Sequence, residues 1–382
     1  MKDIFTLHQA EYEAPPKVVA AAPGVVKFLG EQIEASDPLV LGAALSFEVR
    51  VAISERRDSS LRFFAADLSE HKRTSIGNLK FKKEDRWANY PKSIIDAMLK
   101  QGLPARGLNF TIASDVPQAV GLGSSNALTL ATALALKEFY GLSSKSDELA
   151  ELARRAVHDF MGLRTSLADS LTAALATPAS ISIVDYRSGR RRALPFLDGD
   201  YITVLTDSKV PRLSVDSELQ QREDDCRKAL EHISGQSSKK SLRDCGPEEI
   251  DDLMGVLPES MRRRCLHVVE ENLRVLEAED ALAKGDAAAF GRVINKSHAS
   301  LRNLYEVSCP EVDWLQKRAT EIEGVLCSRL TGKGFGGCTV SIMKRDSVPE
   351  YKKRLEDYER IFGFRAIVYE AEIAGGIRLI SQ

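Results

Sequence analysis

The sequence lacks the short motifs that mark several common classes of protein. It has no Walker A motif, G-x-x-x-x-G-K-[ST], so a P-loop nucleotide-binding fold is not indicated. Its six cysteines are far apart and form no C-x-x-C pair, which predicts reduced thiols without a metal site, with Cys226 and Cys265 packed in a core. No apolar run approaches the roughly 18 residues of a membrane span, and no leader-like apolar segment opens the chain, so we expect a cytoplasmic protein.

An excess of charge of either sign is also missing. Lysine and arginine number 53 against 55 aspartates and glutamates, a net charge of -2, so we expect no nucleic-acid or membrane partner. With 382 residues, 43% of them hydrophobic, the chain is too long for one typical core. We expect two domains, 1–200 and 201–382, because the composition turns charged and helical over 212–265.

The most informative stretch is 115–140, DVPQAVGLGSSNALTLATALALKEFY, in which a glycine-containing loop leads directly into a predicted helix. Backbone N–H groups at a helix N-terminus lack intrahelical acceptors and the helix dipole is positive there, so an anion can bind. Gly121 and Gly123 let backbone approach a phosphate closely, while Ser124 and Ser125 offer hydroxyls for capping, for a phosphate or for Mg2+. An ordinary serine-capped helix explains the same residues, so the loop alone does not decide.

Two further stretches contain candidate functional residues. Asp169 lies among small apolar residues in a predicted helix, LRTSLADSLTAALA, where an unpaired carboxylate is costly to bury, so it either faces solvent or has a function. Residues 328–344, SRLTGKGFGGCTVSIMK, form a glycine-rich loop leading into an alternating strand. Four glycines within six residues exceed what a hairpin turn requires, so backbone must approach another loop or a ligand closely there.

Periodicity predicts the surrounding elements. Residues 18–34 are typical of two short strands joined by a turn at Pro23-Gly24, residues 41–56 of a further strand pair, and the arginine-rich 188–192 of a solvated hairpin tip. Other strands are expected at 107–117, 180–186, 201–208 and 364–373. Helices are expected at 86–103, 125–140, 143–161, 267–286, 289–305, 310–324 and 351–363.

Three loops, in this order and at these separations, resemble the three signature motifs of the GHMP small-molecule kinases, and specifically of the galactokinase family. Residues 22–34, APGVVKFLGEQIE, resemble A-P-G-R-V-N-L-I-G-E-H-T-D. Residues 116–127, VPQAVGLGSSNA, resemble P-x-G-x-G-L-S-S-S-A, and residues 331–338, TGKGFGGC, resemble T-G-A-G-F-G-G-C. WANYPK at 87–92 and LRNLYEVSCPEVD at 301–313 are also similar to family segments, so the resemblance covers roughly the whole chain.

The resemblance implies an α+β, two-domain GHMP kinase fold. It implies a ribosomal S5-like N-terminal domain, a ferredoxin-like C-terminal domain and an active site in the cleft between them. The implied activity is transfer of the γ-phosphoryl of MgATP to the anomeric hydroxyl of galactose or a close relative. ATP and Mg2+ are therefore the expected cofactors, a small sugar the expected partner and a monomer the expected state.

Matching positions imply the site residues. Asp169 corresponds to the family's catalytic aspartate, because GLRTSLADSLTAALA aligns with G-x-x-S-G-x-M-D-Q-x-A-S-A, and would orient the sugar hydroxyl or accept its proton. Ser125 would ligate Mg2+. Trp87 would lie at the adenine, although an aromatic in that place more often covers the edge of a core. The phosphates would be held by Gly121, Leu122, Gly123, Ser124, Ser125 and Asn126, and the sugar by Glu31, Gln32, Glu34, Gly162, Asp169, Gly334 and Gly336.

Several positions depart from the family pattern. Val25 stands where the family has an Arg that stabilises the transferring phosphoryl group, and loss of such a group typically costs about 100- to 1000-fold in rate. Val157 stands where the family has a metal-binding Glu. Residues 32–34 replace the sugar-contacting H-T-D, and Leu219 replaces an expected Tyr.

Two lysines that the family lacks are candidates for restoring the lost positive charge. Lys27 stands where the family has Asn, and Lys333 where it has Ala.

Three functions then fit the sequence. The first is a galactokinase-type sugar kinase that uses Asp169, the second is a non-catalytic homologue that binds nucleotide or sugar and signals through domain closure, and the third is a GHMP kinase for a different small hydroxylated substrate.

Overall fold

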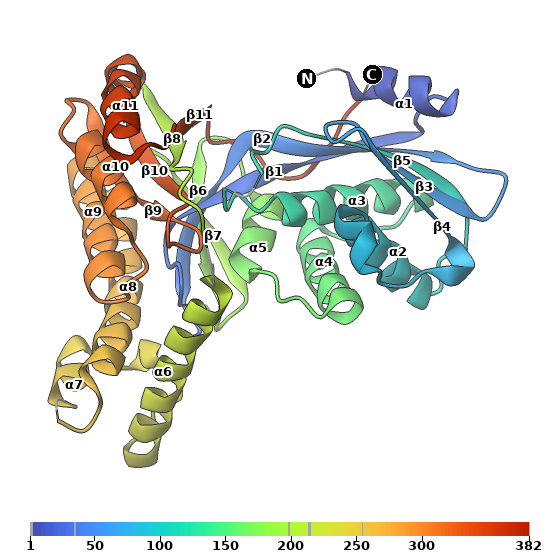
Figure 1. Ribbon diagram of the computed structural model, residues 1–382. Helices are drawn as coiled ribbons and strands as arrows, with labels where there is room; N and C mark the ends of the chain where they lie inside the picture. Colours follow the sequence, from blue (N-terminus) through green and yellow to red (C-terminus); the bar gives the residue numbers. More distant parts are fainter. Residues whose placement is uncertain are drawn as a thin grey trace.

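The computed structural model describes residues 3–33, 36–118, 120–197, 199–212, 215–253 and 255–381. Its strands form two sheets, one in each half of the molecule as drawn in Figure 1, and each sheet has its own covering helices. The strands are β1 (Val18–Leu29), β2 (Leu39–Glu55), β3 (Ser60–Ala65), β4 (Glu70–Ser75), β5 (Leu108–Ser114), β6 (Ser180–Asp185), β7 (Arg190–Pro195), β8 (Tyr201–Asp207), β9 (Val325–Thr331), β10 (Cys338–Lys344), β11 (Ile367–Ala371) and β12 (Arg378–Leu379). The helices are α1 (Ile4–Tyr12), α2 (Asn89–Lys100), α3 (Ser124–Tyr140), α4 (Ser146–Met161), α5 (Leu167–Leu175), α6 (Val215–Gln236), α7 (Pro247–Asp252), α8 (Glu259–Ala283), α9 (Ala287–Asn303), α10 (Pro310–Thr320) and α11 (Val348–Phe362).

The larger sheet has the strand order β12-β1-β2-β5-β3-β4, and β6 and β7 extend it from one end of the long strand β2. Helices α2 to α5 cover one face and α1 lies on the other (Figure 1). Alternation along the strands explains both layers, because successive side chains point to opposite faces. Val19 and Ala52 pack with Ile4 of α1, whereas their neighbours Ala20 and Val51 belong to the main core.

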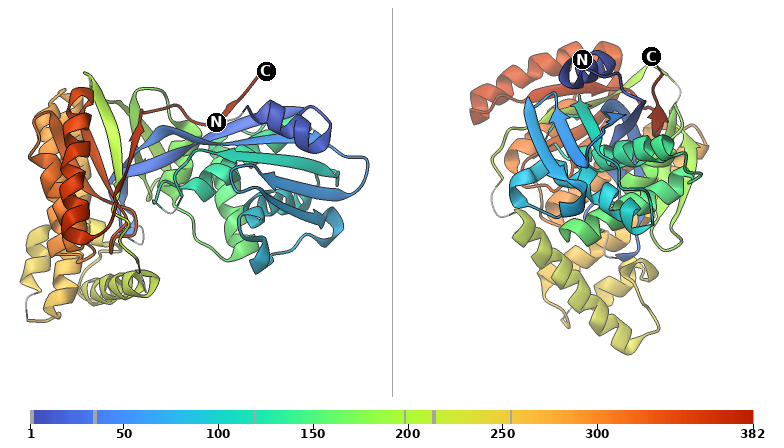
Figure 2. Two further views of the ribbon diagram at one scale, coloured as in Figure 1. Left: turned by 45° about the horizontal axis from the view of Figure 1, so that its top comes forward. Right: turned by 90° about the vertical axis from the view of Figure 1, so that its right-hand side faces the viewer.

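The smaller sheet has the strand order β11-β8-β10-β9 and is entirely antiparallel. Helices α9, α10 and α11 pack beside it and α8 packs on α9, while α6 and α7 extend away from it, as the two views of Figure 2 show. Helix α9 lies directly against β9, the strand that leads into the glycine-rich loop 332–337. The position of that loop therefore depends on the contact between α9 and β9.

The predicted turn at Pro23-Gly24 is wrong, because β1 runs straight through it. Pro23 pairs with Glu48 and Val25 pairs with Ala44, so a bulge absorbs the irregularity without reversing the chain. Gly24 is required for a different reason: a Cβ added there would lie 3.2 Å from the carbonyl oxygen of Leu122. A Pro-Gly pair thus marks a close approach between two segments that are distant in sequence.

Two other predictions of strands need correction, and two strands were missed. Residues 41–56 belong to the single strand β2 and not to a pair of strands, since the whole segment pairs with β1 on one side and with β5 and β6 on the other. The arginines at 190–192 continue into β7, which pairs with β6, so only the residues before them form a turn. Strands β3 and β4 were not predicted, because β4, EHKRTS, is a polar edge strand without an apolar pattern.

The helix predictions are confirmed in type and approximate place. The helices expected at 125–140, 289–305 and 351–363 are α3, α9 and α11, and the one expected at 267–286 is the second part of the longer α8. All six cysteines are free thiols, and Cys226 and Cys265 are buried as expected. Across the described residues, none of the helices combines the length and apolar character needed to traverse a bilayer.

The chain passes from the larger to the smaller sheet between β7 and β8 and later returns. After β11, Ile373 bridges to Leu45 and β12 pairs with Ala20 and Ala21 of β1, so the last residues rejoin the larger sheet. The division into domains 1–200 and 201–382 stays a prediction. That prediction placed the whole C-terminal part in the second domain, whereas β12 pairs with β1 of the larger sheet.

Two helical glycines allow a matched test of the contact between α9 and β9. We expect Gly291→Ala in α9 to lower the free energy of unfolding by about 1–3 kcal/mol, because the new Cβ would lie 2.5 Å from the carbonyl oxygen of Leu326. Gly235→Ala in α6 meets nothing within 4 Å and should instead stabilise by about 0.5–1 kcal/mol. Guanidinium denaturation followed by circular dichroism measures both, and equal effects would contradict the proposed close packing.

Candidate active site

The loop before α3 is held against β1 by backbone contacts. The N–H of Val25 donates to the carbonyl of Leu122 at 3.0 Å. Gly123 is the N-cap of α3, with a left-handed φ of 65°, and no side chain caps the helix. The interpretation of this segment as an ordinary serine-capped helix is therefore wrong, because Ser124 and Ser125 are the first helical residues. The amides at this end of α3 are left without a side-chain cap, as an anion site requires.

The glycine-rich loop 332–337 meets the loop before α3 with almost no space between them. A Cβ added at Gly121 would lie 3.3 Å from the Cα of Gly332, and one added at Gly332 would lie 3.7 Å from the Cα of Gly121. The two loops come from the two different sheets. Their approach answers part of the question left by the four glycines, since Gly332 allows the backbone of the loop containing Gly121 to come close, while the other three glycines lie against other residues.

Asp169 lies in the first turn of α5, close to the loop before α3. The hydroxyl of Ser166 accepts a hydrogen bond from the Asp169 N–H at 3.3 Å, which caps the helix and fixes the backbone of this turn. The carboxylate is close to the start of α3, because its Oδ2 is 3.9 Å from the position that a Cβ on Gly123 would take. The Nζ of Lys27 is 3.7 Å from its Oδ1. The side chains of Asp169 and Lys27 are 22% and 13% exposed, so both can be reached from solvent.

Asn126 links the helix that follows the loop to the helix that contains Asp169. Its Oδ1 accepts a hydrogen bond from the Ser170 hydroxyl at 2.8 Å, and both side chains are buried. Its Nδ2 is buried without a hydrogen-bond partner among the described residues. Because Ser170 follows Asp169 directly, this bond helps fix the distance between the start of α3 and the carboxylate.

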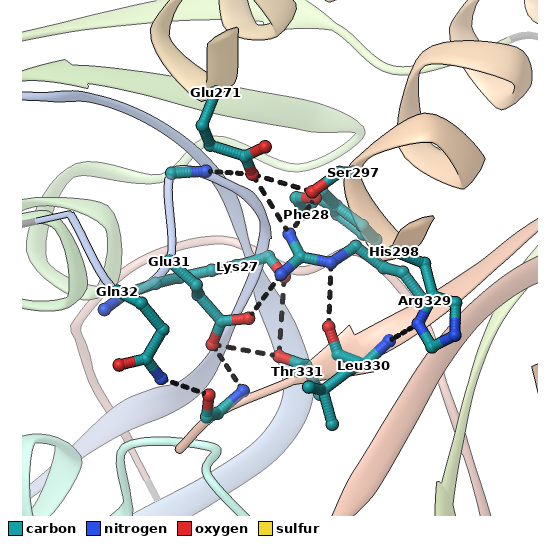
Figure 3. A network of polar contacts seen from close by, with 12 residues as sticks. Lys27, Phe28, Glu31, Gln32, Glu271, Ser297, His298, Arg329, Leu330 and Thr331 are labelled. Carbon is teal, nitrogen blue, oxygen red and sulfur yellow. Dashed lines mark hydrogen bonds and ion pairs between the residues drawn. The ribbon is translucent and has the colours of Figure 1, made fainter. Parts of the chain in front are cut away.

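A buried network of charged groups connects the end of β1 to the glycine-rich loop (Figure 3). Arg329 of β9 is fully buried, and its guanidinium donates to the carbonyl of Phe28 and to Oε2 of Glu31, the latter at 2.8 Å. The other carboxylate oxygen of Glu31 accepts from the N–H of Gly332 and from the Thr331 hydroxyl. The predicted sugar-binding residue Glu31 is thus 5% exposed and engaged within the chain; its contact with sugar stays a prediction.

Glu271 of α8 completes this network from the other side of Arg329. Its Oε1 accepts hydrogen bonds from the N–H of Gly30 at 3.0 Å and from the Ser297 hydroxyl at 2.7 Å. Burial by itself would raise the pKa of Glu271, but Arg274, His267, Arg329 and the hydrogen bond from Ser297 together outweigh burial and hold the pKa at about 2. The carboxylate is therefore ionised at neutral pH and balances the buried arginines.

Other predicted residues are placed as follows. Gln32 lies next to the same network, where its side-chain amide donates to the carbonyl of Gly332 at 2.7 Å. Gly334 and Gly336 pack tightly, since added Cβ atoms would lie 2.4 Å from the Val307 carbonyl and 2.9 Å from Val210. Glu34, the remaining residue of the predicted sugar loop, lies outside the described residues.

Gly162 and Trp87 have structural partners of their own. Gly162 ends α4 in the left-handed conformation and has open space around it. The indole of Trp87 donates to Glu70 at 2.9 Å and packs against the main core, so it covers a core edge, and its contact with adenine stays a prediction.

Most of the residues that depart from the family pattern are apolar and pack against other apolar side chains. Val25 and Val157 are buried. Ile33, from the altered sugar loop, and Leu219, from α6, belong to one hydrophobic cluster, so these two replacements pack in the same core. Lys333 points elsewhere: it pairs with Asp216 of α6, and its side chain is 61% exposed.

Sequence reasoning missed Arg329 and Glu271, which hold the site together. An arginine within an alternating strand and a glutamate on a long charged helix both look like surface residues. The available signal was position, because Arg329 lies two residues before the T-G of the third motif and therefore close to the glycine-rich loop.

The comparisons with known proteins agree with this geometry. Residues 89–177 match the family model described as "GHMP kinases N terminal domain", residues 278–359 match "GHMP kinases C terminal", and residues 6–55 match "Galactokinase galactose-binding signature". Galactokinases of Roseiflexus sp. and Streptococcus mutans are 35% and 32% identical to the chain, over 97% and 94% of it and 94% of each relative.

Solved structures of a galactokinase and of a mevalonate kinase are also similar to this chain. The crystal structure of Lactococcus lactis galactokinase complexed with galactose superposes with a TM-score of 0.89 at 27% identity, covering 98% of both chains. Methanococcus jannaschii mevalonate kinase, 18% identical, shares the fold with a TM-score of 0.68 over 94% of this chain and 98% of its own. The expected two-domain α+β fold of the GHMP kinases is thereby confirmed. Within that class, the chain belongs to the galactokinase family.

Removing the central guanidinium should destabilise the protein strongly. We expect Arg329→Met to lower the free energy of unfolding by about 3–5 kcal/mol, because Glu31 and Glu271 would remain buried without their shared cation. The matched control is Arg155→Met, which removes an ion pair with Glu151 whose arginine is 63% exposed; it should cost less than about 1 kcal/mol. Denaturant titration compares the two, and a loss for Arg329→Met as small as the control's would refute the network's role.

Acid should weaken the same network. The pKa of Glu271 is lowered from its ordinary value of 4.5 to about 2, so its contribution to stability is complete above pH 4.5 and is lost as the pH falls towards 2. The difference in unfolding free energy between wild type and Glu271→Gln should therefore be largest above pH 4.5 and shrink between pH 4.5 and 2. If this difference in unfolding free energy stays constant between pH 4.5 and 2, the lowered pKa of Glu271 is disproved.

Proposed function

We propose that the protein is an ATP-dependent sugar kinase of the galactokinase type, which transfers the γ-phosphoryl of ATP to the anomeric hydroxyl of galactose or a close relative. The observation that carries the proposal is the position of the Asp169 carboxylate beside the uncapped N-terminus of α3, with Oδ2 3.9 Å from a Cβ position on Gly123. An acceptor for a hydroxyl proton and a site for an anion are the two parts that phosphoryl transfer to an alcohol needs.

In the proposed reaction, the anomeric oxygen forms a bond to the γ-phosphorus, and the bond from that phosphorus to the bridging oxygen of ATP breaks. ADP is the leaving group, and the hydroxyl proton passes to the carboxylate of Asp169. The Ser166 cap fixes the backbone from which this carboxylate projects. Backbone amides of residues 121 to 126 would bind the phosphates, which accords with the close backbone packing that Gly121 makes possible.

Mg2+ would be bound chiefly by the nucleotide. Within the described ranges of the chain, His, Cys, Asp and Glu side chains form no cluster of three or more that could hold a metal ion. Mg2+ commonly keeps several waters and binds phosphate oxygens with few protein ligands, and we propose the hydroxyl of Ser125, at the start of α3, as its protein ligand. Bound Mg2+ would neutralise part of the triphosphate charge.

The sugar assignment is supported by the relatives and by the matched galactose-binding signature at 6–55. Gln32, Glu34 and Gly162 are proposed to face the sugar together with Asp169. The alternatives, a non-catalytic sensor or a kinase for another hydroxylated compound, have no comparable observation in their favour. We further propose a monomer in the cytoplasm, where six reduced cysteines are stable.

Replacing the carboxylate tests the proposal. Asp169→Asn should lower kcat for sugar-dependent ADP release by about 100- to 10000-fold, because the amide cannot accept the hydroxyl proton. The control is Asp159→Asn, which changes an exposed carboxylate on α4 and should leave the rate unaltered. The coupled assay uses galactose, other hexoses and hexosamines as acceptors. If the wild type turns over none of them, the kinase assignment fails; if Asp169→Asn retains the wild-type rate, the role of Asp169 fails.

A further inference from the structure

The strand β1 presents a lysine on the face where the family's motif presents an arginine. Val25, which occupies the arginine position, is 4% exposed and contributes no charge. Between Val25 and Lys27 the pairing with β2 is regular, with Val25 opposite Ala44 and Lys27 opposite Gly42. Residues two apart on a regular strand point to the same face of the sheet. The side chain of Lys27 therefore projects from the same face of β1 as an arginine at position 25 would.

The ammonium group of Lys27 reaches the reacting region. Its Nζ is 3.7 Å from Oδ1 of Asp169, and the other carboxylate oxygen faces the start of α3 at Gly123. At this distance the two side chains form an ion pair that is longer than the 2.7–2.9 Å of a direct charge-assisted hydrogen bond, and it places the ammonium beside the proposed catalytic carboxylate. In Figure 3, the Lys27 side chain extends from β1 away from the buried Arg329 network.

The second candidate for the missing charge lacks this geometry. Lys333 lies on the glycine-rich loop, but its ammonium pairs with Asp216, whose side chain is 85% exposed. An ion pair that faces solvent is screened and cannot concentrate charge on a reacting group. The structure thus separates two lysines that the sequence left equivalent.

We infer that Lys27 is a catalytic residue that contacts the transferring phosphoryl group and supplies the positive charge that Val25 cannot. The inference rests on the proposed kinase function. As the anomeric oxygen bonds to the γ-phosphorus and the bridging oxygen leaves with ADP, negative charge spreads over the phosphoryl oxygens, and the Lys27 ammonium stabilises it. Asp169 must itself be a carboxylate to accept the hydroxyl proton, and the Lys27 ammonium lies beside that carboxylate.

The experiment removes the cation and then restores it at the other position. Lys27→Asn, which installs the family's residue, should lower kcat by about 100- to 1000-fold while KM for the sugar changes by only a few-fold. The double variant Val25→Arg/Lys27→Asn recreates the family arrangement and should recover most of the lost rate. Lys100→Met, which removes an exposed lysine of α2, is the control and should behave as the wild type.

A binding measurement distinguishes contact with the phosphoryl group from a structural effect. ADP with aluminium fluoride imitates the phosphoryl group in transfer, so Lys27→Asn should weaken its binding about 100-fold while binding of ADP alone changes less than threefold. This readout does not depend on whether the buried Val25 position accepts an arginine.

Two outcomes would overturn the inference: a folded Lys27→Asn variant with kcat within threefold of wild type, or equal losses of affinity for ADP and for ADP with aluminium fluoride. Absence of sugar turnover in the wild type is a different result, because it removes the proposed function itself.

Discussion

The contact between Arg329, Glu31 and Glu271 determines where the two halves of the site lie. Transferring three charged groups into a fully buried position is unfavourable unless each finds its partners, and here the partners come from β1, β9 and α8. The network can be satisfied only when the end of β1 and the start of the glycine-rich loop are in one relative position. The glycine-rich loop begins shortly after Arg329, and the loop that contains Gly121 is bonded to β1 through Val25 and Leu122, so the approach of Gly121 to Gly332 follows from that position.

The proposed site therefore depends mainly on backbone and on buried groups. The proposed phosphate site is the start of α3, the carboxylate of Asp169 lies in the capped first turn of α5, and the ammonium of Lys27 projects from a regular stretch of β1. Each group lies on a regular element, and regular elements hold side chains more precisely than loops do. The altered sugar loop is different, because Ile33 joins a hydrophobic cluster with Leu219, which exchanges polar recognition for apolar packing in that part of the site.

Sequence reasoning recovered the features that local patterns determine. The helix after the glycine loop and the place of Asp169 in a helix of small residues were found, because spacing and residue type specify them directly. The three motif loops were matched through their resemblance to the family's motifs. The turn at Pro23-Gly24 was wrong because tertiary pairing with β2 overrode a local turn signal. Arg329 and Glu271 were missed because burial of a charge is a property of long-range contacts, and the difference between Lys27 and Lys333 likewise depends on which distant carboxylate each one meets.

The strand β12 has a mechanical consequence for the whole molecule. The polypeptide crosses between the sheets twice, once after β7 and once after β11, and β12 is then bonded to β1. Two bodies joined by two covalent tethers cannot twist freely about a single bond; their easiest relative movement is rotation about the line through both crossings. Any opening that admits a nucleotide would accordingly be a hinge about that line, and its amplitude would be limited by the shorter tether.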